Sequence, residues 1–108
     1  MAVLYITEFA DITSFMQGGK LFQMPQQPPV VEQAIATSGS SASSAAFNSK
    51  TRYVRLHNDS SSAVCFLFGT GTVTAVAGTN ARLSAGTTEY HAVPVGQSYK
   101  VAAVTVAT

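Results

Sequence analysis

The second half of the chain consists of short apolar stretches of strand length, each followed by residues that favour turns. Residues 51–57 (TRYVRLH) alternate, so that Val54 and Leu56 face one way, as in a half-buried strand. Small, polar or Pro/Gly-containing turn sequences lie at 58–62 (NDSSS), 69–71 (GTG), 85–86 (AG) and 94–96 (PVG). Strands at this spacing predict an all-β fold, an antiparallel β-sandwich or a jelly-roll-like barrel.

The remaining strands follow from residue type. Residues 63–68 (AVCFLF) are continuously apolar, so we expect the most buried strand there, covered on both faces. Residues 88–93 alternate, and residues 99–106 form a β-branched final strand. Residues 81–84 predict a short strand, and residues 72–77 a weak strand or a loop.

The first 36 residues are apolar but irregular. Residues 4–9 and 21–24 resemble strands, and the pair Gly18-Gly19 is suited to turning the chain between them. The sequence MPQQPP at 24–29 predicts a stiff, extended spacer, because each Pro fixes its own backbone and restricts the residue before it. We therefore divide the chain into an extended N-terminal arm (1–36), a Ser/Ala-rich loop (37–50) and a β-sandwich core (51–108).

The apolar side chains of the arm require burial, since disordered tails are poor in such residues. Two interpretations remain open: the arm adds ordinary strands to its own domain, or it grips a neighbouring chain, for example by adding a strand to a sheet edge. We expect residues 1–24 to be the gripping part and residues 30–35 to join the sandwich. The predicted partner-binding residues are Leu4, Tyr5, Ile6, Phe9, Ile12, Phe15, Leu21, Phe22 and Met24.

The chain is unusually poor in charge. Of its 108 residues 46% are hydrophobic and only 10% are charged, whereas soluble domains average roughly 25% charged residues. Either an Ala/Ser-rich surface is soluble enough by itself, or much of it is covered in an assembly such as a homo-oligomer. A net charge of +1 from scattered residues argues against direct nucleic-acid binding. No apolar run is long enough for a membrane span.

The N-terminal residues and the cysteine content predict where the protein is made. The N-terminus lacks the basic region of a signal peptide, and Glu8 interrupts its apolar run. A lone cysteine, Cys65, has no partner for an internal disulfide. Together these features predict synthesis in a reducing cytoplasm.

Few residues suggest chemistry. Cys65 with His57 or His91 would be a nucleophile with a base, but Cys65 lies in the most apolar run and predicts a buried small hydrophobe. Glu89 and His91 share one face of a strand, which suits a metal or an acid–base pair, yet no third ligand is evident and an exposed polar face explains them better. We predict no catalytic centre, cofactor or metal, and hence no enzyme.

Three tyrosines support an alternative function. Tyr53, Tyr90 and Tyr99 are suited to stacking on sugars, as in a carbohydrate-binding module, although tyrosine is also an ordinary strand residue.

Five segments occur in a recurring order of strands and turns: YVRLHND (53–59), CFLFG (65–69), LSAGTTEY (83–90), VPVG (93–96) and VAAV (101–104). This order, which covers about residues 51–106, resembles the small β-sandwich virion proteins of tailed bacteriophages. It implies a capsid decoration or cement protein that stabilises the shell and contacts the major capsid protein or other virion subunits. Neck, tail and fibre subunits share this architecture, so they stay alternatives within the virion.

Overall fold

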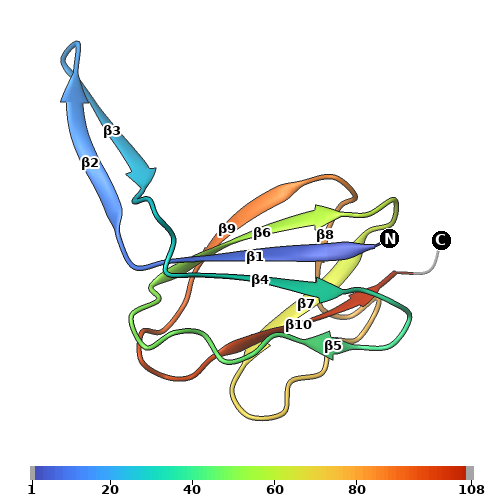
Figure 1. Ribbon diagram of the computed structural model, residues 1–108. Coiled ribbons are helices and arrows are strands. Elements are labelled where there is room, and N and C mark those ends of the chain that lie inside the picture. Colours follow the sequence, from blue (N-terminus) through green and yellow to red (C-terminus); the bar gives the residue numbers. More distant parts are fainter. Residues whose placement is uncertain (1, 107–108) are drawn as a thin grey trace.

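The computed structural model describes residues 2–106, apart from the side chains of Thr13 and Phe15, and these residues form antiparallel sheets without a helix (Figure 1). The predicted all-β sandwich is confirmed. Within the described residues, no helix is available that is long and apolar enough to cross a membrane. The strands are β1 (Val3–Phe9), β2 (Ile12–Gln17), β3 (Lys20–Pro25), β4 (Val31–Ala36), β5 (Ala42–Ser43), β6 (Tyr53–Asp59), β7 (Val64–Gly69), β8 (Ala81–Leu83), β9 (Thr88–Ala92) and β10 (Lys100–Thr105).

Two four-stranded sheets pack face to face. The first has the order β4-β1-β6-β9 and the second the order β5-β10-β7-β8, and every pairing is antiparallel. Strands β2 and β3 pair only with each other, and this hairpin projects beyond one end of the sandwich (Figure 1). The start of β1 and the end of β10 lie at the other end, where Thr37 N donates to Ala2 O and Thr105 N donates to Ser38 O.

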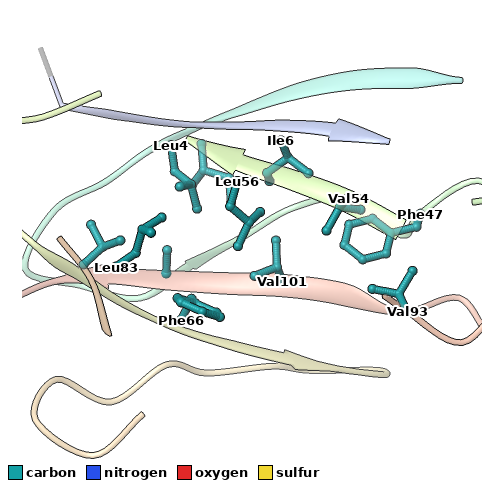
Figure 2. Packing of buried hydrophobic residues seen from close by; sticks show 12 residues of the cluster. Leu4, Ile6, Phe47, Val54, Leu56, Phe66, Leu83, Val93 and Val101 are labelled. Atoms are coloured by element: carbon teal, nitrogen blue, oxygen red, sulfur yellow. The ribbon is translucent and has the colours of Figure 1, made fainter. Parts of the chain in front are cut away.

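The core lies between the two sheets and follows the alternation of the strands. In the first sheet, the side chains of alternate residues of β1 and β6 point inward, and in the second sheet those of β7 and β10 meet them (Figure 2). The buried cluster consists of Leu4, Ile6, Ile35, Phe47, Val54, Leu56, Val64, Phe66, Leu83, Val93, Val101 and Ala103.

The strand expected to be most buried, β7, is covered on both faces over only half its length. Val64 and Phe66 face the main core, while Cys65 faces the other side of the sheet. There Cys65 packs with Ala75, which belongs to the loop that folds back over this sheet. Beyond the reach of that loop Leu67 is 39% exposed, so the expectation is wrong for the end of the strand.

The N-terminal stretch is not one arm. β1 is a central strand of the first sheet, hydrogen-bonded to β4 on one side and β6 on the other. Leu4, Ile6 and Phe9 are at most 2% exposed, so the prediction that they bind a partner from the arm is wrong. An apolar strand with two pairing neighbours in its own chain is buried there, and only residues 12–25 are left outside the sandwich.

The predicted spacer differs from expectation, and the predicted loop differs in part. The residues after β3 do not continue as a stiff extended segment, because the chain bends at residues 27 and 28 before β4. Within the Ser/Ala-rich stretch, the short strand β5 pairs with β10, and the Phe47 side chain enters the core. The rest of residues 37–50 is the expected loop, which β5 and Phe47 attach to the sandwich.

Candidate interaction site: the projecting hairpin

A two-residue turn defines the hairpin. Gly18 and Gly19 have φ values of +60° and +77°. Positive φ at both central residues is the type I′ geometry that matches the twist of paired strands, and it favours glycine. The turn sets Gln17 opposite Lys20, and pairing continues to Ile12 opposite Pro25.

Apolar side chains cover the hairpin and lie in solvent. Four of them are more than half exposed: Ile12 (51%), Met16 (66%), Leu21 (62%) and Met24 (57%). Phe22 is 41% exposed. Lys20 is the one formally charged side chain within residues 12–25. An apolar surface of this kind, with a single formal charge, indicates an interaction site on a small chain.

Polar contacts fix the base of the hairpin to the sandwich. The carbonyl oxygen of Asp11 accepts hydrogen bonds from Gln26 N at 3.0 Å and from the Tyr53 hydroxyl at 2.7 Å. The Phe9 and Tyr53 rings stack with their centroids 5.2 Å apart. These contacts restrain the direction in which the hairpin leaves the sandwich, so it is presented as a defined projection.

An open cleft lies between the hairpin and the first sheet. It has a volume of about 390 Å³ and is mostly apolar. Tyr90 of β9, 54% exposed, forms part of its wall and adds an aromatic surface beside the hairpin. The cleft is lined by Ile12, Gln23, Met24, Pro25, Tyr53 and Tyr90.

Replacing Tyr53 with phenylalanine tests the attachment of the hairpin. Burial raises the pKa of the Tyr53 phenol above its ordinary value near 10, and Tyr90 and Asp11 add to this shift. Below pH 10 the phenol is protonated in both the folded and the unfolded chain. Above pH 10 the unfolded chain loses the proton first, so the stability of the folded state falls as pH rises. At pH 7 the free energy of unfolding of Tyr53→Phe should be about 1 kcal/mol lower than that of wild type, because the variant lacks the hydrogen bond to Asp11 O.

Above pH 10 the free energies of unfolding of wild type and Tyr53→Phe should converge, because only the wild type carries this titration. Urea unfolding across the alkaline range measures the difference. Tyr5→Phe, which alters an exposed tyrosine, serves as the control and should show no such convergence. A constant difference between wild type and Tyr53→Phe at every pH would contradict the assignment.

A buried carboxyl group connects three segments of the sandwich near the hairpin. Glu8 is fully buried, and its Oε1 accepts hydrogen bonds from Thr51 Oγ1 at 2.7 Å and from Asn48 N at 2.8 Å. Its Oε2 accepts from Gln33 Nε2 at 2.7 Å. In the sequence Glu8 is only a polar interruption of an apolar run; the even spacing with Leu4 and Ile6 is the signal that places it on the inward face.

The predicted partner-binding residues separate into three groups. Ile12, Leu21, Phe22 and Met24 lie together on the hairpin. The Phe15 backbone pairs with Phe22 in β2, and its side chain lies outside the described part of the structure. Tyr5 is 43% exposed but lies on the outer face of the sandwich, and the other three are core residues. Met16, the most exposed of the large apolar side chains that the structure describes, belongs with the hairpin group.

The residues considered for chemistry are not brought together. Cys65 faces outward from the second sheet, whereas His91 packs on the inward-facing Phe66, with ring centroids 5.1 Å apart. His57 pairs with Tyr5 in register, so it lies on the outer face of the first sheet, and its Nδ1 is 2.8 Å from Thr88 Oγ1. Neither histidine therefore forms a nucleophile–base pair with the cysteine.

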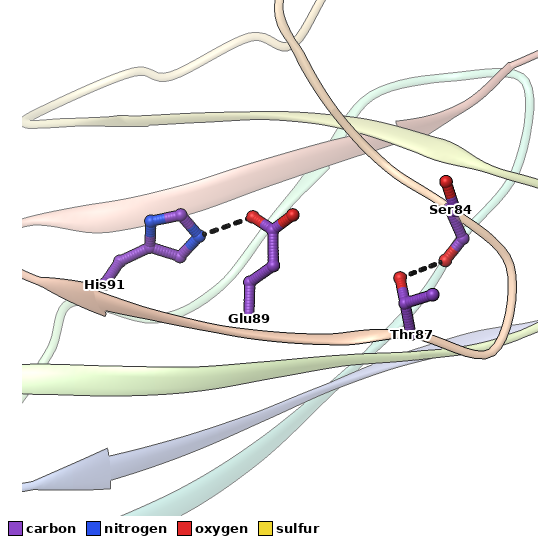
Figure 3. A network of polar contacts seen from close by, with 4 residues as sticks. All are labelled: Ser84, Thr87, Glu89 and His91. Carbon is purple, nitrogen blue, oxygen red and sulfur yellow. Dashed lines mark hydrogen bonds and ion pairs between the residues drawn. The ribbon is translucent and has the colours of Figure 1, made fainter.

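Glu89 and His91 form a pair at one edge of the sandwich. His91 Nε2 lies 3.1 Å from Glu89 Oε1, and nearby the Thr87 hydroxyl donates to Ser84 O at 2.6 Å (Figure 3). Among the described residues no cluster of three or more His, Cys, Asp or Glu has a geometry that would hold a metal ion. The contact is an exposed ion pair when the histidine is protonated, which contributes little to stability.

No protein-family model, curated protein sequence or solved structure matches this chain.

Proposed function

We propose that this chain is a structural subunit of a virion that binds a capsid shell as a decoration or cement protein, with the hairpin of residues 12–25 as its gripping arm. The observation that carries the proposal is the hairpin with a single charge and exposed apolar side chains, which projects from a small sandwich. The resemblance of residues 51–106 to phage virion proteins supports a virion as the assembly that the hairpin binds.

The mechanism is burial of the hairpin against neighbouring shell subunits. Apolar area removed from water contributes about 25 cal/mol per Å², and this gain must exceed the cost of association. An arm already ordered by its turn and its base loses less entropy on binding than a disordered tail. Many copies on one lattice add avidity, so that a modest contact per subunit holds the shell together.

The hydrogen bond from Gln26 N to Asp11 O gives a clean way to remove the arm. Because these two residues already pair, residues 12–25 can be replaced by Asn-Gly, which closes a two-residue hairpin turn. This variant should keep the thermal unfolding of the sandwich and lose retention on purified shells by at least about tenfold. A control with Gly18→Asn alone, which keeps a type I′ turn, should bind normally. Full retention of the armless variant would contradict the proposal.

Two alternatives make different predictions. A neck, tail or fibre subunit would be present at on the order of a dozen copies per particle, whereas a lattice-wide decoration protein would be present in the hundreds. Measuring the number of copies per purified particle distinguishes these two roles.

For the carbohydrate-binding alternative, Tyr53 is buried and Tyr99 is partly buried, which leaves Tyr90 as the exposed ring of the three.

A further inference from the structure

The edge strands of this chain differ in how they are protected from pairing with other chains. Natural proteins protect an edge with charged side chains, with proline or by keeping the strand short. Strand β2, ITSFMQ, is an edge strand of six residues with no charge and no proline. Each other edge strand of the described sheets has a protecting feature: Glu32 in β4, Glu89 in β9, Arg82 in the three-residue β8, a length of two residues in β5, and Lys20 with Pro25 in β3.

The hairpin register shows which backbone groups lie on the open edge. In a two-residue hairpin the residues that flank the turn, here Gln17 and Lys20, exchange hydrogen bonds, and the pattern then alternates along the strands. The N–H and C=O groups of Ile12, Ser14 and Met16 therefore point away from β3. On β3, Pro25 occupies an outward position and offers no N–H there.

We propose that the open edge of β2 pairs with β2 of a second copy of this chain, antiparallel about a twofold axis. A twofold contact joins the same surface on both copies, so the strand must be able to pair with itself. β2 meets this condition because it is neutral, and no like charges face each other in the pair. The second copy supplies an unprotected edge of matching length, which none of the sandwich edges provides.

Pairing with a second copy also gives the hairpin the additional strands that a stable sheet needs. A two-stranded ribbon alone is only marginally stable in water, and three or more strands are needed for an independent sheet. Joining two hairpins gives the order β3-β2-β2-β3. With Ser14 opposite Ser14 of the second copy, Ile12 lies opposite Met16, so exposed apolar side chains cover each other on one face. This inference does not depend on the proposed virion role.

Cysteine crosslinking tests the register directly. Ser14 and Gln23 are cross-strand neighbours, and both are exposed. In the paired sheet the two copies of Ser14 lie about 5 Å apart, whereas the two copies of Gln23 lie three strand spacings, or roughly 14 Å, apart. A disulfide requires Cα atoms within about 7 Å. Native Cys65 is 2% exposed and does not compete.

The full-length Ser14→Cys protein should form disulfide-linked dimers under mild oxidation at least about tenfold faster than the full-length Gln23→Cys protein. Equal rates for the two variants, or no dimer from either, would overturn the proposal.

A charge-pairing experiment provides a second measurement without oxidation. We expect the wild-type chain to self-associate in sedimentation velocity experiments. Ser14→Lys places two like charges opposite each other and should abolish this association, whereas Gln23→Lys should leave it unchanged. An equimolar mixture of Ser14→Lys and Ser14→Glu proteins should restore association, because opposite charges then face each other. Failure of the mixture to associate, or equal effects of the two lysine variants, would refute the pairing of β2 with itself.

Discussion

Replacing Glu8 with alanine is expected to destabilise the sandwich by about 3 kcal/mol, because three donors lose their acceptor at once. The hydroxyl of Thr51, 1% exposed, then lies in the interior without a hydrogen-bond partner, and the contacts to Gln33 and Asn48 are lost with it. A domain of this size has a total stability of roughly 5–15 kcal/mol, so the loss is a large fraction of it. Urea unfolding monitored by circular dichroism measures the effect.

Two further variants show whether the hydrogen bonds, rather than a charge on β1 or β4, carry this effect. Glu8→Gln keeps one acceptor oxygen but turns an NH₂ group toward one of the donors, so we expect an intermediate loss of roughly 1–2 kcal/mol. Glu32→Ala removes an exposed carboxyl group from neighbouring β4 and should change stability by less than about 0.5 kcal/mol. Comparable losses of unfolding free energy for Glu8→Ala and Glu32→Ala would contradict the assignment of the effect to the buried hydrogen bonds of Glu8.

Replacing Leu4 with alanine is expected to cost about 3 kcal/mol, which would lower the melting temperature by about 15 °C. Leu4 is fully buried between the sheets, and truncating it removes apolar burial and leaves a cavity. A partner-binding arm residue would behave differently, because its removal would weaken an intermolecular contact and leave the isolated chain unchanged. Differential scanning calorimetry of the purified protein distinguishes the two roles.

Leu21 provides the matched comparison. It is the same residue type in the same N-terminal stretch, but it is 62% exposed on the hairpin. Leu21→Ala should change the free energy of unfolding by less than about 0.5 kcal/mol. If Leu21→Ala destabilised the isolated chain as much as Leu4→Ala, the division between sandwich and hairpin would be incorrect.

The strands of the second half could be predicted because local signals and tertiary environment agree there. In β6, for example, Val54 and Leu56 alternate with polar residues, and the turn that follows is rich in Asn, Asp and Ser. The extent to which β7 is buried depends on a segment that is distant in the sequence. Cys65 is covered because the loop with Ala75 folds over it, and nothing in residues 63–68 reveals how far that loop reaches.

The N-terminal stretch was harder to predict, because an apolar strand shows that it needs burial but does not show where. Leu4 and Leu21 both occur in short strand-like stretches with apolar residues, yet one lies between the sheets and the other in solvent. What separates them is pairing: β1 fits between β4 and β6, whereas the Gly18-Gly19 turn folds β2 and β3 onto each other. The position of Glu8 on the inward face followed from this pairing and not from its own residue type.

The way in which the hairpin joins the sandwich determines how a pulling force would act on the protein. The hairpin continues directly from β1, which is held in register with β6 over seven residue pairs, from Val3 opposite Asp59 to Phe9 opposite Tyr53. A load applied at the hairpin and directed along β1 would therefore shear that whole ladder at once, instead of opening its hydrogen bonds one after another. The strand that carries the projection is thus also a mechanically resistant one, because it is bordered by a partner on each side.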